Sequence, residues 1–107
     1  MATPKQAAQW KDTTSYSRSD AEPRTAREWT FTGSDPLITI EVTIHRHMHH
    51  PPTTWLLSCR NVGVQNYVLG RRGAVLSAVD AQHAALARVE ELLSRMSADV
   101  RRAMGEG

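Results

Sequence analysis

The alternation of apolar and polar residues from Ile38 to His47 constrains the fold of this chain more than any other feature of its sequence. In the segment "ITIEVTIHRH", Ile or Val occupies every second position through Ile44, and Thr, Glu or His fills the positions between. Successive side chains of a strand point to opposite faces, so the pattern predicts a strand with one buried and one solvent-facing side. The strand is expected to end before Pro51 and Pro52, because proline cannot donate to a sheet ladder.

Three further strands are predicted from β-branched and aromatic runs between turn signals, at residues 28–32, 53–59 and 64–69. The turns between the strands are expected at "GSDP" and "RNVG". In the first of these strands Trp29 and Phe31 are expected to face the core. The lone Cys59 is expected to be a packing residue, because it shares the apolar side of its strand.

The spacing of apolar residues changes at Ser77, which is followed by Asp80 in an arrangement that resembles a helix N-terminal capping box. Beyond it, apolar residues recur mostly at intervals of three and four, which predicts one helix to about residue 103. This predicted stripe consists of Val79, Leu86, Val89, Leu93, Met96, Val100 and Met104. Its first part, including Leu93, is expected to pack on the sheet. The expected fold class is therefore α+β: an antiparallel sheet of three to five strands with one long C-terminal helix on one face.

The predicted helix is too long for the sheet. At 1.5 Å per residue it spans about 39 Å, whereas a six-residue strand spans only about 20 Å. We expect the last two turns to project beyond the sheet and to bind a protein partner or a second copy of the chain, because isolated helical turns are marginal in water. The residues expected to make this contact are Val100, Arg101 and Met104, arginine being enriched at interfaces.

Residues 1–27 are expected to form a polar N-terminal arm ahead of a single domain at residues 28–107. The chain has no Val, Ile or Leu before Leu37, and Thr, Ser, Asp and Pro are frequent in the arm. The segment "TPKQAAQWK" is compatible with a short helix, with Thr3 as its cap and a proline at its first position. Trp10 is the strongest apolar anchor of the arm and a candidate contact for a partner.

The composition favours a cytoplasmic protein. There is one cysteine, no signal-peptide-like apolar run at the start, and no stretch near the roughly 20 apolar residues needed to span a membrane. We find no Ser-His-Asp arrangement, phosphate-binding glycine loop or paired carboxylates. We therefore expect no catalysis, no cofactor, no small-molecule substrate and no membrane contact.

A histidine cluster follows the alternating strand. His45, His47 and His49 alternate along it, so neighbouring members would project about 6–7 Å apart on one face. Two histidines on one face can ligate a metal, but a structural zinc site takes four ligands, usually from two elements, and no second cluster complements this one. The sequence therefore predicts no functional metal site, and these histidines are only weak candidates.

Arginines supply the alternative of nucleic-acid binding. The net charge is only +2, but Arg46, Arg60, Arg71 and Arg72 concentrate positive charge in the middle of the chain. The loop "GRRG" could hold a phosphate, with a helix N-terminus just after it. An ordinary solvated loop explains the same residues.

Two resemblances bear on function. The β-rich segment followed by "LSAVDAQHAALARVEELL" is similar to the end of a double-stranded-RNA-binding domain, whose α-β-β-β-α fold would place "TPKQAAQWK" in its first helix. That family has a lysine cluster at the start of the last helix, where this chain has Ser77, Asp80 and Gln82, so no binding residue is carried over. Over about residues 28–96, "WxLSC…G" with "A-x-x-A-A-L-A-x-V" also resembles small uncharacterised accessory proteins of high-GC bacteria and their phages.

The second resemblance and the projecting helix together favour one function. We expect a small non-catalytic binding protein, encoded by a phage or acting on a host factor, that works through protein–protein contacts. A small nucleic-acid-binding module is the alternative.

Overall fold

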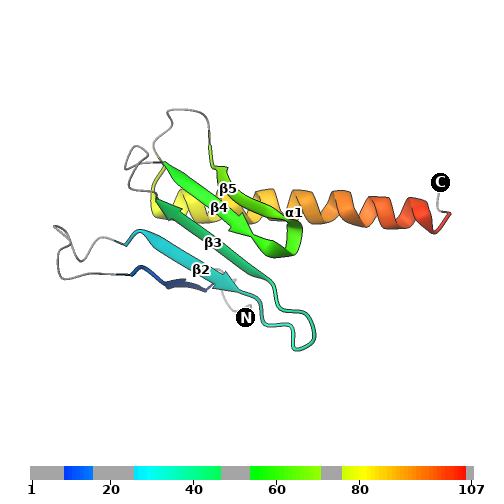
Figure 1. Cartoon of the computed structure of the whole chain (residues 1–107), viewed down its shortest axis with the longest axis horizontal. Helices are drawn as coiled ribbons and strands as arrows, with labels where there is room; N and C mark the ends of the chain where they lie inside the picture. The colour runs from blue at the N-terminus through cyan, green and yellow to red at the C-terminus, as the bar shows by residue number, and fades with distance from the viewer. Residues whose placement is uncertain (1–8, 16–25, 47–53, 71–75, 106–107) are drawn as a thin grey trace, which may run out of the picture.

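The computed structural model describes residues 9–15, 26–46, 54–70 and 76–105. In this part of the chain, five strands form one antiparallel sheet in chain order, and one helix crosses a face of the sheet (Figure 1). The elements are β1 (Trp10–Asp12), β2 (Glu28–Thr32), β3 (Glu41–Arg46), β4 (Trp55–Cys59), the short 3-10 helix η1 (Arg60–Val62), β5 (Val64–Val68) and α1 (Ala78–Ala103). The predicted α+β class is confirmed, with five strands and the long C-terminal helix.

Strand β1 consists of residues that the sequence assigned to the polar arm. It pairs antiparallel with β2, Trp10 lying opposite Phe31, and the two rings pack with their centres 5.9 Å apart. An open strand edge offers unpaired backbone groups to any extended segment beside it. Trp10 and Lys11 are therefore in a strand rather than in the suggested short helix, and the sheet begins before residue 28. Residues 1–8 lie outside the described part.

Strand β3 confirms the alternation seen in the sequence. Val42 and Ile44 are completely buried on the side that faces α1, and Thr43 is half-buried on the other side. Ile38 departs from the pattern, because it lies before the strand and is 72% exposed. The backbone N–H of Ile38 is held by the side chain of Asp35, so the chain bends there before it enters β3.

Strand β4 carries the centre of the core. Trp55, Leu57 and Cys59 are buried, as their shared side of the strand predicts. The indole N–H of Trp55 donates to the backbone carbonyl of Leu76 at 3.1 Å, which ties β4 to the residues just before α1. The predicted "RNVG" turn is formed by η1 and Gly63, whose φ of 71° is in the left-handed region that favours glycine.

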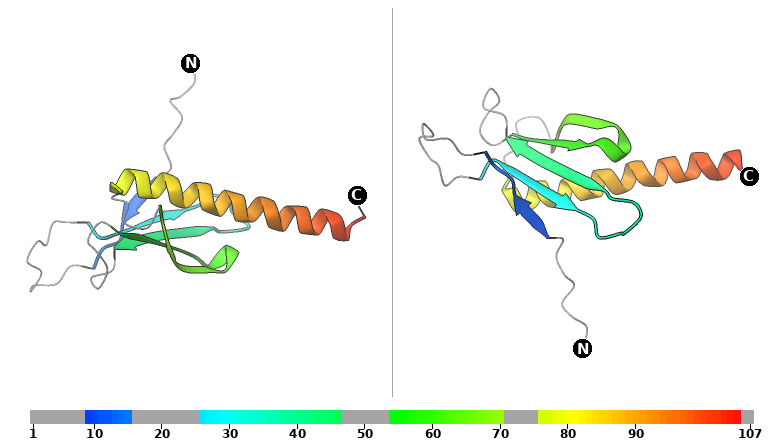
Figure 2. Two further views of the ribbon diagram at one scale, coloured as in Figure 1. Left: turned by 90° about the horizontal axis from the view of Figure 1, so that it is seen from above. Right: turned by 60° about the horizontal axis from the view of Figure 1, so that its bottom comes forward.

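Helix α1 begins where the sequence predicts. The hydroxyl of Ser77 accepts the backbone N–H of Asp80 at 3.1 Å, which satisfies one of the free donors of the first turn. The helix contacts β3, β4 and η1 across one face of the sheet and then continues past the end of the sheet (Figure 2).

The side of α1 that meets the sheet differs from the predicted stripe. The buried residues are Ala81, Ala85 and Val89, whereas Val79 and Leu93 are 58% and 40% exposed. Large apolar residues defined the predicted stripe, but the sheet already presents large side chains to the helix. Alanines fill the remaining space because they let the helix backbone approach closely, and interiors are packed without gaps. The expectation that Leu93 belongs to the core is therefore wrong.

This placement of the helix predicts opposite outcomes for two substitutions. Ala85→Leu should lower the free energy of unfolding by about 1–3 kcal/mol, because it adds volume between helix and sheet. Leu93→Asp should cost less than about 1 kcal/mol, because the side chain is partly exposed and its charge can reach solvent. Urea unfolding at low protein concentration measures both, and a larger cost for Leu93→Asp would mean that the helix packs on its large residues.

Candidate functional site

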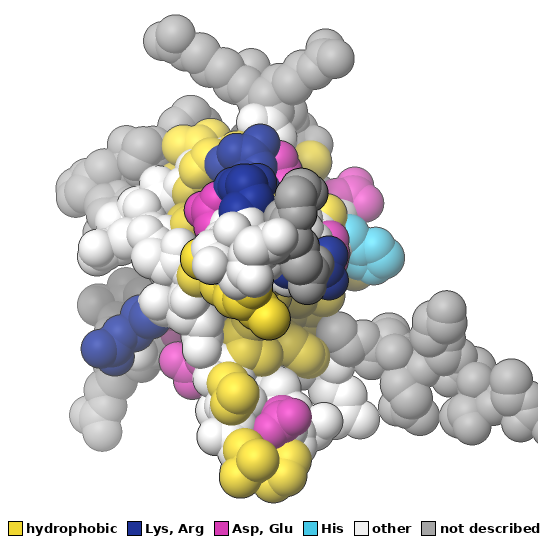
Figure 3. All heavy atoms as spheres, turned by 90° about the vertical axis from the view of Figure 1, so that its right-hand side faces the viewer, with side chains coloured by type: hydrophobic (Ala, Val, Ile, Leu, Met, Phe, Trp, Pro, Cys, Tyr) yellow, Lys and Arg dark blue, Asp and Glu magenta, His cyan; other side chains and the backbone are white. Residues whose placement is uncertain are grey.

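The projecting part of α1 exposes apolar side chains in increasing amounts. We call residues 93–104 the helix overhang. Exposure rises from 40% at Leu93 through 47% at Met96 and 58% at Val100 to 70% at Met104. Figure 3, which views the molecule from the end where the helix projects, shows hydrophobic side chains gathered on and beneath the helix end. These residues continue the helix stripe after the sheet has ended, so the described structure covers progressively less of each side chain.

The polar side of the same helix is occupied by ion pairs within the helix. Glu91 accepts from Arg88 at 2.7 Å and from Arg95 at 3.0 Å, and Asp99 pairs with Arg102. The Arg88 hydrogen bond is the main cause that lowers the pKa of the Glu91 carboxyl. Pairs at these spacings stabilise an exposed helix only modestly. They support the helix beyond the sheet and leave its apolar side free to bind.

A second apolar surface lies at the end of the sheet past which the helix projects. The loop between β2 and β3, residues 33–40, turns at this end of the sheet, below the middle of α1 in Figure 1. It carries Leu37, which is 90% exposed, and Ile38. We call the six residues of the two surfaces the apolar end: Leu37, Ile38, Leu93, Met96, Val100 and Met104.

The β2–β3 loop is held by its own polar contacts. The carboxylate of Asp35 accepts the backbone N–H groups of Leu37 at 2.8 Å and Ile38 at 3.0 Å. The N–H of Gly33 donates to the carbonyl of Ile40 at 2.8 Å, and a Cβ at Gly33 would lie 2.7 Å from the Ile40 side chain. The backbone hydrogen bonds to Ile38 and Leu37 lower the pKa of Asp35 from its ordinary value of 3.8. A locally bonded loop therefore presents the two exposed residues.

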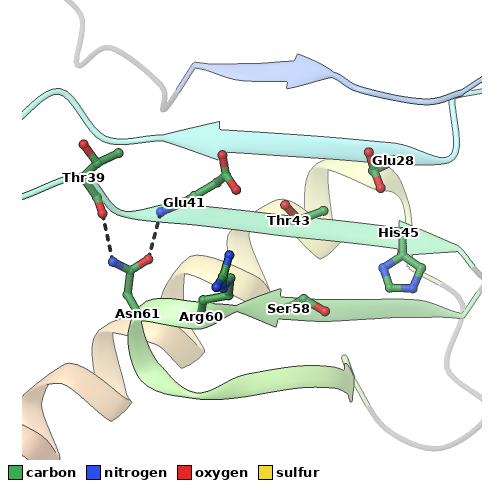
Figure 4. Close-up of a pocket in the computed structure, with 8 residues that line it drawn as sticks. All are labelled: Glu28, Thr39, Glu41, Thr43, His45, Ser58, Arg60 and Asn61. Carbon is green, nitrogen blue, oxygen red and sulfur yellow. Dashed lines mark hydrogen bonds between the residues drawn. The ribbon is translucent and has the colours of Figure 1, made fainter.

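The opposite face of the sheet is polar and holds a shallow hollow of about 750 Å³ (Figure 4). Its Asn61 and Thr43 side chains are engaged within the sheet. The side chain of Asn61 donates to the carbonyl of Thr39 at 2.9 Å and accepts the N–H of Glu41 at 3.1 Å. The hydroxyls of Thr13, Thr30 and Thr43 form a row across three strands, with successive distances of 3.0 and 3.2 Å. This row stabilises the sheet.

The histidine candidates are not brought into a metal site by the residues that the structure describes. His45 lines the polar hollow and lies opposite Glu28 across the β2–β3 pair. Among residues 9–15, 26–46, 54–70 and 76–105, no group of three or more His, Cys, Asp or Glu side chains could hold a metal ion. His47 and His49 lie outside the described residues.

The arginine candidates are separated. Arg46 lies at the end of β3, where its guanidinium donates to the carbonyl of Ala26 at 3.0 Å and stacks 5.2 Å from the Trp55 ring. Arg60 follows the other end of β4 and lines the polar hollow beside Glu41. The first is therefore engaged in the fold, and the two do not form one basic surface. Arg71 and Arg72 lie outside the described residues.

The candidates for protein contact lie in two places, the helix overhang and strand β1. Val100, Arg101 and Met104 are exposed on the helix overhang. Trp10 is half-buried in β1 and packs beside the core, so its contact with Phe31 belongs to the fold. The sequence indicated the overhang but missed Leu37 and Ile38. The available signal was Asp35, whose side chain can cap the backbone two or three residues on and so interrupt the strand pattern.

Comparisons with known proteins return no match: no family model, no curated protein and no solved structure is similar to this chain. Within the described ranges, α1 lacks the run of apolar residues that a membrane-crossing helix would need. The function is therefore inferred from the geometry of the chain itself.

The Asp35 contacts predict a pH-dependent loop. Because the folded pKa is lowered, the stabilisation of the loop is present above pH 3.8 and is lost as the pH falls through the lowered pKa. Asp35→Ala should speed amide exchange at Leu37 and Ile38 at neutral pH, while Ser34→Ala should not. NMR titration and exchange measure both effects. An Asp35 carboxyl that titrates at or above 3.8, or unchanged exchange in Asp35→Ala, would contradict the geometry.

Proposed function

We propose that this chain is a small non-catalytic binding protein that acts through protein–protein contacts at its apolar end. The observation that carries the proposal is the apolar stripe of the helix overhang, which becomes more exposed toward its C-terminal end while the polar side is internally paired. Monomeric soluble proteins rarely expose large contiguous apolar patches, and larger ones mark interaction sites.

The chemistry of the apolar end suits a protein partner. Met96 and Met104 have flexible, polarizable side chains that adapt to an irregular apolar surface. Arg101 borders the stripe, and arginine at the rim of an apolar contact can donate to partner carbonyls and carboxylates. The polar hollow is a poorer candidate, because its Asn61 side chain is bonded to the backbone of Thr39 and Glu41 and its Thr43 hydroxyl to that of Thr30.

Nucleic-acid binding remains a prediction of the sequence alone, because Arg46 and Arg60 lie at opposite ends of β4 and the former is engaged with Trp55 and Ala26. If it occurred, affinity for a duplex would fall steeply with salt. Binding through the apolar end should depend only weakly on salt.

The test is capture of partners by tagged full-length protein from the native cell lysate supplemented with an untagged copy of the chain. The double variant Val100→Asp and Met104→Asp should lose capture, because it places two charges on the apolar stripe. Ser94→Asp, on the polar side of the same helix, should retain capture. Equal capture by all three proteins, or no capture by the unaltered chain, would contradict the proposal.

A further inference from the structure

We propose that the partner of the apolar end is a second copy of this chain, with the two helix overhangs antiparallel about a two-fold axis near Ala98. This inference rests on the proposed function and names the partner. Three observations carry it: the spacing of the stripe, the distribution of charge along α1, and the second apolar surface on the β2–β3 loop.

The spacing of the stripe matches that of paired helices. Leu93, Met96, Val100 and Ala103 follow at intervals of three, four and three, which is the pattern of a coiled-coil seam. With the axis near Ala98, Met96 lies beside the partner's Val100 and Leu93 beside the partner's Ala103. The small side chain of Ala103 leaves room for the partner's Leu93. Each contact occurs twice because the interface is self-complementary, and the assembly closes at two copies.

The charges on α1 favour the antiparallel arrangement. Glu90 and Glu91 lie on the last turn before the overhang, and Arg101 and Arg102 lie on its final turn. In antiparallel overhangs the helix dipoles oppose, and Arg101 and Arg102 of each copy lie opposite Arg95 and Ser94 of the other, about one turn from its Glu90 and Glu91. A parallel pair would place the arginine turns side by side.

The size of a stable interface requires more than the two helix ends. Stable specific complexes bury about 1,200–2,000 Å² in total, and each helix overhang offers only about three turns to such a contact. The antiparallel arrangement carries the partner's Met104 back toward the end of the sheet, where Leu37 and Ile38 are exposed. The β2–β3 loop therefore completes the contact, and this explains why Asp35 fixes its two apolar residues outward.

Sedimentation equilibrium of the full-length protein tests the inference. The unaltered chain should be a dimer, Met96→Glu should be a monomer, and Ser94→Glu should remain a dimer. If circular dichroism shows that Met96→Glu is unfolded, Val100→Glu is used in its place. An unaltered chain that stays monomeric up to about 1 mM, where even weak contacts are populated, overturns the inference. A dimer that survives both stripe substitutions also overturns it.

A disulfide cross-link tests the predicted position of the loop. In Ile38→Cys/Met104→Cys, oxidation should give a covalent dimer on a non-reducing gel. The matched control Ile38→Cys/Val79→Cys should stay monomeric, because Val79 lies at the other end of α1. Equal dimer formation by both proteins, or none by the first, overturns the inference.

Different results would refute the second-copy inference and the proposed function. A monomeric chain that captures a different protein through Val100 and Met104 refutes the second-copy inference and leaves the proposed function standing. A dimer unaffected by substitution of the stripe, together with unchanged capture, refutes both.

Discussion

The close packing of the alanine side of α1 against β3 and β4 is the contact on which the rest of the structure depends. Ala81 and Ala85 are fully buried against a sheet that contributes Val42, Ile44 and Leu57 to the same core. Because the helix presents small residues, the sheet side chains can fill the interface without gaps. Because the alanine side of α1 faces the sheet, larger apolar residues of the helix such as Val79 and Val100 are left exposed.

The helix is also much longer than the sheet. α1 has 26 residues, and at 1.5 Å per residue it spans about 39 Å, while the strands have at most six residues. Burial ends at Val89, yet the apolar stripe does not. Apolar residues are tolerated singly on any surface, but a continued stripe on a projecting helix favours a partner. This is why the proposed function concerns the end of the molecule and not the polar face of the sheet.

The sequence predicted those strands and helix ends that depend on residues close together in the chain. The alternation around Val42 and Ile44 predicted both the strand and its buried side, and Ser77 predicted the start of α1 to the residue. The strand at Trp10 was not predictable in this way, because it depends on pairing with Phe31, which is distant in sequence. The rotation of α1 was missed because alanine counts little in a hydrophobic pattern although it packs most closely.

The candidate site was predictable only in part for the same reason. Val100 and Met104 followed from helix length alone. Leu93 was assigned to the core side of the helix, and the structure leaves it 40% exposed. Ile38 fitted the strand alternation, and only the side-chain bond from Asp35 shows that it lies in a loop.

Amide hydrogen exchange along α1 at two protein concentrations shows whether a second copy of the chain covers the helix overhang. Amides of residues 81–92 should be protected equally at both concentrations, because the sheet covers that part of the helix. Amides of residues 93–103 should be weakly protected in dilute protein and gain protection as concentration rises. Protection of residues 93–103 that is strong and independent of concentration would show that the overhang is stable without a second copy, and would contradict pairing of the two overhangs.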